Sequence, residues 1–166
     1  MIDKQLIADV AAVHGLPVSL VEAVIMVESG GNPWAVRYEP AFLSRYVSGK
    51  NHPRYGACSR ATEEQGLAHS WGLMQVMGLT AREEGFMEPF LSQLCEPRTG
   101  MDVGCRHLAR LARHFPASTG YGWDAVCAAY NGGRGVVRSP KDFRNPEYPA
   151  KVCKILGGAW PKRMGA

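Results

Sequence analysis

The sequence lacks any long hydrophobic run. No stretch of its 166 residues approaches the roughly 20 consecutive apolar residues that a membrane-spanning helix needs. The best candidate near the N-terminus, Leu6 to Val13, is interrupted by Asp9 and followed by His14. We therefore expect neither a membrane anchor nor a signal peptide.

Metal-binding motifs are also missing. No CxxC or HExxH occurs, and the spacing of the five cysteines fits no common zinc pattern, so we expect no metal and no cofactor. Cys105 and Cys127 lie on apolar helical stripes and are expected to be buried thiols. Cys58, Cys95 and Cys153 stay open as partners in a disulfide, and because the count is odd, at least one cysteine remains outside any intrachain bridge.

The composition is that of an ordinary globular protein, with 46% apolar and 20% charged residues. The length predicts one domain over residues 1–166. Alternation of apolar and polar residues at period two is nearly absent, and no internal repeat occurs. The sequence therefore predicts a mainly α fold, with any β-structure confined to a small ribbon around residues 56–78.

Apolar residues recur at helical spacing in several segments. Capping boxes predict helix starts at Ser19 and Thr80, and the strongest amphipathic stripe begins at Met101. Turn and polar residues dominate residues 48–70, which we expect to be irregular and exposed. The expected helices cover about residues 6–13, 19–29, 80–84, 101–115, 123–130 and 146–156.

The net charge of +4 is unevenly distributed. From Arg134 onward eight basic residues oppose two acidic ones, whereas residues 1–133 are slightly acidic. Such a segment either meets solvent or attracts an anionic envelope polymer; no motif for nucleic-acid binding accompanies it. The basic residues are Arg134, Arg138, Lys141, Arg144, Lys151, Lys154, Lys162 and Arg163.

Glu28 breaks the apolar pattern of its segment. Its spacing from Val21, Val24 and Ile25 places a carboxylate on the apolar face of a helix. It also lies in the last turn, where the negative end of the helix dipole disfavours an anion. Burial and the dipole both favour the protonated carboxyl group, which a general acid requires. The alternative is an ordinary glutamate at a helix end that points to water.

Three short segments occur in an order that is typical of one protein family. They are Glu28-Ser-Gly-Gly-Asn-Pro33, then Gly72-Leu-Met-Gln75, then Ala129-Tyr-Asn-Gly-Gly133. Together they resemble the signature segments of the soluble lytic transglycosylases, which share a fold with goose-type lysozymes. The resemblance extends from about Val18 to Val152 and implies a lysozyme-like (α+β) domain, mainly helical, with a β-ribbon or irregular excursion within residues 48–78.

The resemblance implies cleavage of the β-1,4 bond between N-acetylmuramic acid and N-acetylglucosamine in peptidoglycan. Glu28 would protonate the glycosidic oxygen and then accept the proton of the muramyl C6 hydroxyl, whose oxygen attacks C1. The product would be a 1,6-anhydromuramyl end. Because the sugar supplies its own nucleophile, one carboxylate would suffice where ordinary glycosidases use two.

The same resemblance assigns substrate-binding roles to further residues. Gly72 would allow the glycan to approach the backbone, and Met74 and Gln75 would line the cleft wall. Core packing is the alternative for Met74 and Tyr130. Tyr130, Asn131 and Tyr148 would lie beside the catalytic carboxyl group, and Ser29 would orient that group or the substrate. The expected substrate-binding residues are Ser29, Gly72, Leu73, Met74, Gln75, Tyr130, Asn131 and Tyr148.

Residues 37–40 depart from the short forms of the family. The segment Arg37-Tyr-Glu-Pro40 resembles phage-type members. Glu39 is either a second carboxylate, which would make the enzyme a hydrolytic muramidase, or a structural partner of Arg37 or Arg45.

Two further functions compete with the lytic transglycosylase and the muramidase. One is a non-catalytic wall-binding or virion module. The other is a cysteine peptidase built on Cys127 and His107, which the apolar surroundings of Cys127 disfavour. With no export signal expected, a wall-cleaving enzyme would be carried in a phage virion, released by a holin, or delivered by a secretion machine.

Overall fold

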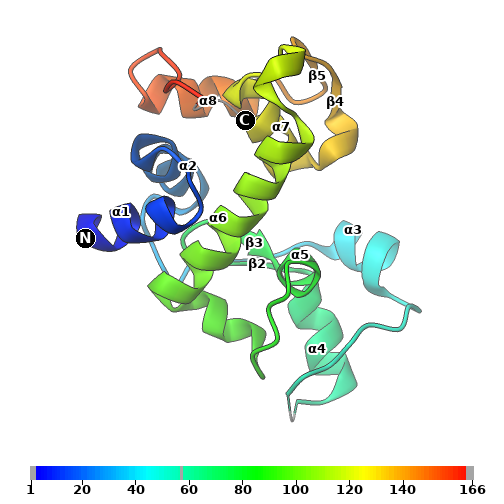
Figure 1. Cartoon of the computed structure of the whole chain (residues 1–166). Coiled ribbons are helices and arrows are strands. Elements are labelled where there is room, and N and C mark those ends of the chain that lie inside the picture. The colour runs from blue at the N-terminus through cyan, green and yellow to red at the C-terminus, as the bar shows by residue number, and fades with distance from the viewer. Residues whose placement is uncertain (1–2, 57, 164–166) are drawn as a thin grey trace. The chain divides into compact units, whose positions relative to one another are not determined.

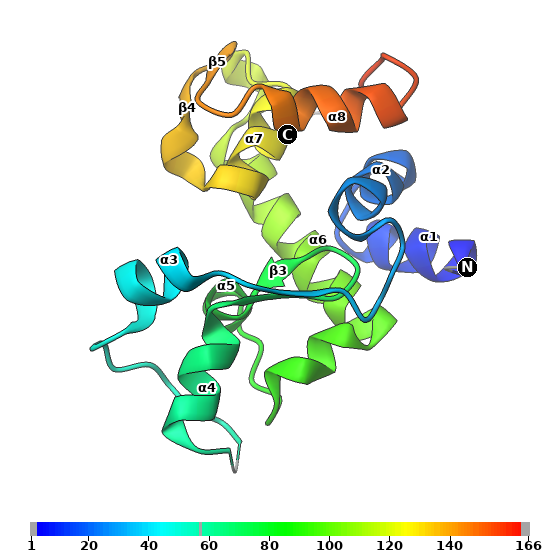
Figure 2. The same cartoon turned by 180° about the vertical axis from the view of Figure 1, so that it is seen from behind.

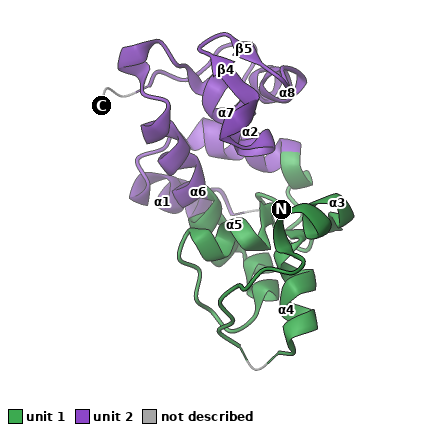
Figure 3. Ribbon diagram, turned by 90° about the vertical axis from the view of Figure 1, so that its right-hand side faces the viewer, with its two compact units in different colours: residues 1, 28–104 green, residues 2–27, 105–166 purple. Residues whose placement is uncertain are grey.

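The computed structural model describes residues 3–56 and 58–163. These residues form two compact units, one built from residues 28–56 and 58–104 and the other from residues 3–27 and 105–163 (Figure 3). Helices and two small antiparallel sheets make up the units, which confirms the predicted mainly α fold. The single domain over residues 1–166 stays a prediction.

The N-terminal part of the second unit is a pair of helices. Helix α1 (Lys4–Val13) is capped by Asp3, whose carboxylate accepts a hydrogen bond from the Gln5 backbone N–H at 2.9 Å. Helix α2 (Val18–Ser29) buries its apolar residues from Leu20 to Ile25. The predicted capping box at Ser19 is wrong, because α2 begins one residue earlier.

Within the described residues, no helix by itself has the length and apolar character to cross a membrane. Only α1 and α2 taken together reach that length and composition, and the chain bends by 116° between them.

A three-stranded antiparallel sheet organises the first unit. Strands β1 (Val36–Tyr38), β2 (His69–Trp71) and β3 (Val76–Met77) lie in that order, and Figure 1 shows β2 and β3 side by side. The predicted ribbon is confirmed for β2 and β3, whereas β1 comes from a segment where no strand was expected.

The segment between β1 and β2 is more ordered than predicted. Helix α3 (Pro40–Phe42) continues into a π-helical turn (Leu43–Val47), and helix α4 (Arg60–Leu67) follows. Ser59 caps α4 by accepting a hydrogen bond from the Thr62 backbone N–H at 3.1 Å. The prediction of an irregular, exposed excursion is therefore wrong for residues 60–67.

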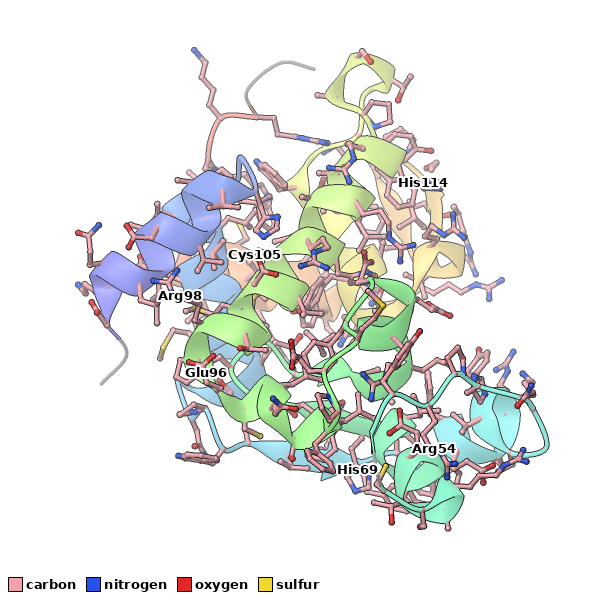
Figure 4. All side chains as sticks on the ribbon, turned by 60° about the horizontal axis from the view of Figure 1, so that its bottom comes forward. Arg54, His69, Glu96, Arg98, Cys105 and His114 are labelled. Carbon is pink, nitrogen blue, oxygen red and sulfur yellow. The ribbon has the colours of Figure 1, made fainter. Side chains whose placement is uncertain are left out.

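Two short elements lead to the longest helix. Helix α5 (Gly78–Glu83) begins two residues before Thr80, so the second predicted capping box is also wrong. A 3₁₀ turn (Leu91–Cys95) precedes α6 (Pro97–His114). Figure 4 labels Glu96 just before this helix, where its carboxylate accepts hydrogen bonds from backbone N–H groups of the first turn. The amphipathic stripe that predicted α6 is buried.

The rest of the second unit follows α6. The helices α7 (Trp123–Gly132) and α8 (Glu147–Ile155) pack against each other, as Figure 2 shows. Between them lie the strands β4 (Val137–Ser139) and β5 (Asp142–Phe143). Both helices are close to their predicted bounds, but this hairpin falls outside the range expected for β-structure. Two 3₁₀ turns, Ala117–Thr119 and Arg134–Val136, complete the order.

Arg163 is half-buried in the second unit, where its guanidinium is held by backbone carbonyl groups. Its guanidinium donates to the carbonyl oxygens of Ala112, Phe115 and Tyr121 at 2.7–2.8 Å and lies 4.8 Å from the ring centre of Trp123. The carbonyls of Ala112 and Phe115 belong to the C-terminal end of α6, where helical partners are absent. Arg163 therefore ties the chain's end to this helix.

The cysteines carry thiols. Cys95, Cys105 and Cys127 are buried, as expected for the last two, and Cys58 and Cys153 are half-buried. Burial raises the pKa of the Cys95 thiol, and a backbone hydrogen bond involving Gly72 opposes this effect.

Candidate active site

Glu28 is the second-last residue of the α2 helix and is half-buried. The next residue, Ser29, fixes this helix end: its hydroxyl donates to the Leu73 carbonyl oxygen at 2.8 Å and accepts from the Gly31 backbone N–H at 3.2 Å. The Ser29–Leu73 bond joins two of the three signature segments. Ser29 thus holds the backbone beside Glu28, and its role in orienting the substrate stays a prediction.

The turn at Gly72 needs glycine for two reasons. Its φ of 69° lies in the left-handed region. A Cβ atom on Gly72 would also collide with the Leu94 carbonyl oxygen. Packing against Leu94 therefore explains this glycine, which is buried, and the approach of a glycan to its backbone stays a prediction.

Leu73 and Met74 point into the core. Leu73 is 1% exposed and Met74 is 0% exposed. A Cβ atom on Gly104 of α6 would lie 2.6 Å from the Met74 sulfur, so the two residues are in close contact. Core packing, the alternative that the sequence offered for Met74, therefore describes its side chain, and its contact with a substrate stays a prediction.

Gln75 stabilises the turn with its side chain. It adopts a φ of 47°, which is uncommon for a residue other than glycine. Its amide nitrogen donates to the carbonyl oxygens of Ala35 at 2.9 Å and Gly72 at 3.0 Å. Both amide protons are thus used within the protein, and strain of this kind persists where the surrounding structure holds it.

The carboxylate of Glu39 is paired with the side chain of Arg37. The two charged groups lie 2.5 Å apart, and the Glu39 backbone N–H donates to the Ala68 carbonyl oxygen. This is the structural role that the sequence offered as the alternative to a second catalytic carboxylate. The pair is largely exposed, so its contribution to stability is small.

The third signature segment belongs to the second unit. Tyr130 is half-buried, with its ring centre 5.4 Å from that of His107. Asn131 is exposed, and its side-chain oxygen accepts from the Asn145 amide at 3.0 Å. Tyr148 is 6% exposed on α8. Within the described residues, no three His, Cys, Asp or Glu side chains are grouped to hold a metal ion.

Several residues that support these segments were missed by the sequence analysis. Asn145 also donates to the Ala128 carbonyl oxygen at 3.0 Å and so connects the β4–β5 hairpin region to α7. The Ala35 carbonyl oxygen accepts bonds from both Gly72 and Gln75. A backbone acceptor carries no sequence signal, but an asparagine directly before a predicted helix does resemble a capping residue.

Comparison with known proteins gives consistent matches. Residues 5–148 match the family model described as the transglycosylase SLT domain. The chain is 28% identical over 144 residues to the membrane-bound lytic murein transglycosylase C of Haemophilus ducreyi, covering 80% of this chain and 30% of that protein.

A solved structure shares the fold. The match is to an inactive glutamate-to-glutamine mutant of the lytic transglycosylase Slt from Pseudomonas aeruginosa, with a TM-score of 0.61 and 20% identity. It covers 97% of this chain and 25% of that one. The chain thus spans about a quarter to a third of the length of both relatives. It belongs to the transglycosylase SLT domain family.

Proposed function

We propose that this domain is a peptidoglycan lytic transglycosylase that cleaves the β-1,4 bond between N-acetylmuramic acid and N-acetylglucosamine. Family membership and the names of both relatives support this activity. The observation that carries the assignment of the site is the Ser29–Leu73 hydrogen bond, which connects the segment of Glu28 to the Gly72–Gln75 turn.

Glu28 is the proposed general acid and then general base. Its carboxyl proton passes to the glycosidic oxygen as the bond from that oxygen to C1 of the muramyl sugar breaks. The C6 hydroxyl oxygen then bonds to C1, and its proton returns to Glu28, which restores the carboxyl group. The products are an N-acetylglucosamine end with a new hydroxyl and a 1,6-anhydromuramyl end, so no water is consumed.

The remaining residues support this chemistry in different ways. Ser29, Gly72 and Gln75 fix the backbone next to Glu28, and Leu73 and Met74 form the core below it. We propose that Tyr130, Asn131 and Tyr148 contact the substrate or the carboxyl group. Their polar groups are suited to the acetamido and hydroxyl groups of the sugar.

The release of soluble fragments from labelled peptidoglycan tests the role of Glu28. Glu28→Gln, which keeps the shape but removes the transferable proton, is expected to lower the rate at least about 100-fold, the scale of one general acid–base group. Glu39→Gln is expected to retain most of the rate, since Arg37 already engages that carboxylate. Equal loss in both variants would favour the hydrolytic muramidase, and an inactive wild type would favour a non-catalytic wall-binding module.

The basic C-terminal segment is the proposed contact with an anionic envelope polymer. Its unpaired positive charge is smaller than the sequence indicated, because Arg163 is half-buried, Lys141 pairs with Asp124 at 2.8 Å and Arg138 pairs with Asp142 at 3.7 Å. Arg134, Arg144, Lys151, Lys154 and Lys162 are exposed and remain suited to this role. Binding of Glu28→Gln to purified walls should weaken as salt rises; salt-independent binding would contradict this contact.

Delivery by a phage is the proposed route to the wall. The support is the resemblance of Arg37-Tyr-Glu-Pro40 to phage-type members. Expression inside bacteria is expected to cause lysis only when a holin is expressed as well. Lysis at the same rate without a holin would contradict a holin-dependent route.

A further inference from the structure

Three rings form a row on one face of the three-stranded sheet. Tyr38 of β1 lies directly opposite His69 of β2, with ring centres 5.0 Å apart and planes at 30°. Trp71 follows two residues later on β2, with its ring centre 5.5 Å from that of His69. Alternate residues of a strand share a face, so Tyr38, His69 and Trp71 make one continuous strip, here called the aromatic row.

The aromatic row is partly open to solvent. Tyr38 is 42% exposed, and Val36, which shares its face of β1, is 47% exposed. His69 and Trp71 are half-buried; Figure 4 labels His69 in this part of the first unit. Contiguous exposed apolar surface is uncommon on a folded protein and marks binding sites.

Two of the three rings are held in place by helix α4. The Trp71 indole N–H donates to the Gly66 carbonyl oxygen at 2.9 Å. His69 Nδ1 lies 2.6 Å from the Gln65 carbonyl oxygen, which can only accept, so Nδ1 carries the proton. A surface whose side chains are already fixed loses little conformational entropy when a ligand binds.

The aromatic row is continuous with the turn that carries the second signature segment. Ala35 immediately precedes β1, and its carbonyl oxygen accepts from the Gly72 backbone N–H at 2.8 Å and from the Gln75 amide at 2.9 Å. The strand that presents Tyr38 and the turn next to Ser29 therefore share one hydrogen-bonded framework. Through the Ser29–Leu73 hydrogen bond, the same framework reaches the segment of Glu28.

We propose that the aromatic row binds the glycan strand of peptidoglycan, away from the bond that is cleaved; this inference rests on the proposed function. Pyranose rings in a β-1,4 chain present flat C–H faces, which pack favourably on the electron-rich faces of aromatic rings. Because Tyr38 stacks on His69, a sugar packs on the remaining part of the Tyr38 ring, which is 42% exposed. His69 Nε2 and the Tyr38 hydroxyl supply polar groups at the edge for sugar hydroxyl and acetamido groups.

Titration calorimetry with penta-N-acetylchitopentaose tests this binding without turnover. The Glu28→Gln protein is the parent, and Tyr38→Ala is expected to weaken binding about three- to tenfold, as the loss of one aromatic contact predicts. Tyr46→Ala is the matched control, because Tyr46 is 41% exposed but lies outside the row. It should bind like the parent, and Tyr38→Phe should retain most of the affinity.

Equal affinities of Tyr38→Ala and the parent would overturn the proposal, as would equal losses in Tyr38→Ala and Tyr46→Ala. Thermal unfolding of each variant checks that the fold is retained. His69→Ala provides a second variant should Tyr38→Ala unfold, with the same expected loss. A wild-type dimer that Tyr38→Ala converts to a monomer would overturn the proposal in favour of self-association.

Kinetics on peptidoglycan separate this inference from the proposed function. Tyr38→Ala should raise KM about three- to tenfold and leave kcat within about twofold, the pattern of lost uniform binding. If the wild type cleaves peptidoglycan and Tyr38→Ala has the same KM, glycan binding by the aromatic row is overturned, whereas the proposed transglycosylase activity is not. If the wild type does not cleave peptidoglycan but binds chitopentaose in a way that depends on Tyr38, the proposed transglycosylase activity is overturned, whereas glycan binding by the aromatic row is supported.

Discussion

At the residue scale, the most consequential interaction outside the candidate site is a buried ion pair in the first unit. Arg82 and Glu63 are 3% and 4% exposed, and their charged groups lie 2.9 Å apart. Arg82 also donates to the carbonyl oxygens of Phe86 and Glu88 at 2.8 Å. The pair therefore connects α4, α5 and the loop after α5.

Removing one member of this pair leaves the other charge buried without its counter-ion. Glu63→Gln is expected to lower the free energy of unfolding by about 3–5 kcal/mol. Glu64→Gln is the matched control, because Glu64 is adjacent and pairs with the exposed Arg60; it should cost less than about 1 kcal/mol. Urea unfolding measures both, and equal effects would contradict a structural role for the buried pair.

This pair also shows why the sequence analysis misjudged residues 60–67. Only Glu63 and Leu67 of α4 are buried, so the segment has no apolar stripe. A glutamate is expected to be exposed to solvent unless a partner for its charge is known. The partner here, Arg82, lies 19 residues further along the chain, so the sequence near Glu63 does not indicate it. At the candidate site the same limit applies: Glu28 stands out in the sequence, whereas the backbone acceptor of Ala35 does not.

At the element scale, helices with a regular apolar stripe were predicted well. Helices α1, α6, α7 and α8 lie within a few residues of their expected bounds. The starts of α2 and α5 were predicted wrongly, since the backbone at Ser19 and Thr80 is already helical. The short strands β1, β4 and β5 were not predicted, because their pairing with a neighbouring strand defines them and no alternation of apolar and polar residues marks them.

The start of α6 yields a pH-dependent prediction. Burial alone would raise the pKa of Glu96, but hydrogen bonds from Thr99 and Arg98 outweigh it and lower the pKa below 4.5. A lowered pKa in the folded state means that the stabilisation is present above about pH 4.5 and is lost as pH falls through the folded-state value. Glu96→Ala should therefore cost about 1 kcal/mol near neutral pH.

Urea unfolding at several pH values measures this dependence. The difference between wild type and Glu96→Ala should shrink as the pH falls well below 4.5. Glu88→Ala, which removes an exposed carboxylate outside any helix cap, serves as the control. A difference for Glu96→Ala that stays constant with pH would contradict the capping role.

At the scale of the whole molecule, the C-terminal end matters for stability through Arg163. Burial lowers the pKa of Arg163, and Asp124 opposes that effect. Arg163→Ala should lower the free energy of unfolding by about 1.5–3 kcal/mol, since it leaves three carbonyl oxygens without their charged donor. Lys162→Ala should change it by less than about 0.5 kcal/mol. Thermal unfolding compares the two variants, and similar losses of stability would contradict a stabilising role of the Arg163 hydrogen bonds.

The two compact units are expected to unfold together. Helices α2 and α6 each contain residues of both units, so neither unit can unfold completely without breaking helical hydrogen bonds of the other. Calorimetry should show one transition with equal calorimetric and van't Hoff enthalpies. Two resolved transitions would contradict the single domain predicted from the length.

The activity of the molecule is tested most directly by mass spectrometry of the fragments released from purified peptidoglycan. A lytic transglycosylase acting through Glu28 yields fragments that end in 1,6-anhydromuramic acid, and Glu28→Gln yields none. Each anhydro end is lighter than a hydrolytic end by one water molecule, so the two outcomes are distinct. Reducing ends from the wild type would contradict the proposed mechanism, and anhydro ends from Glu28→Gln at the wild-type rate would contradict the role of Glu28.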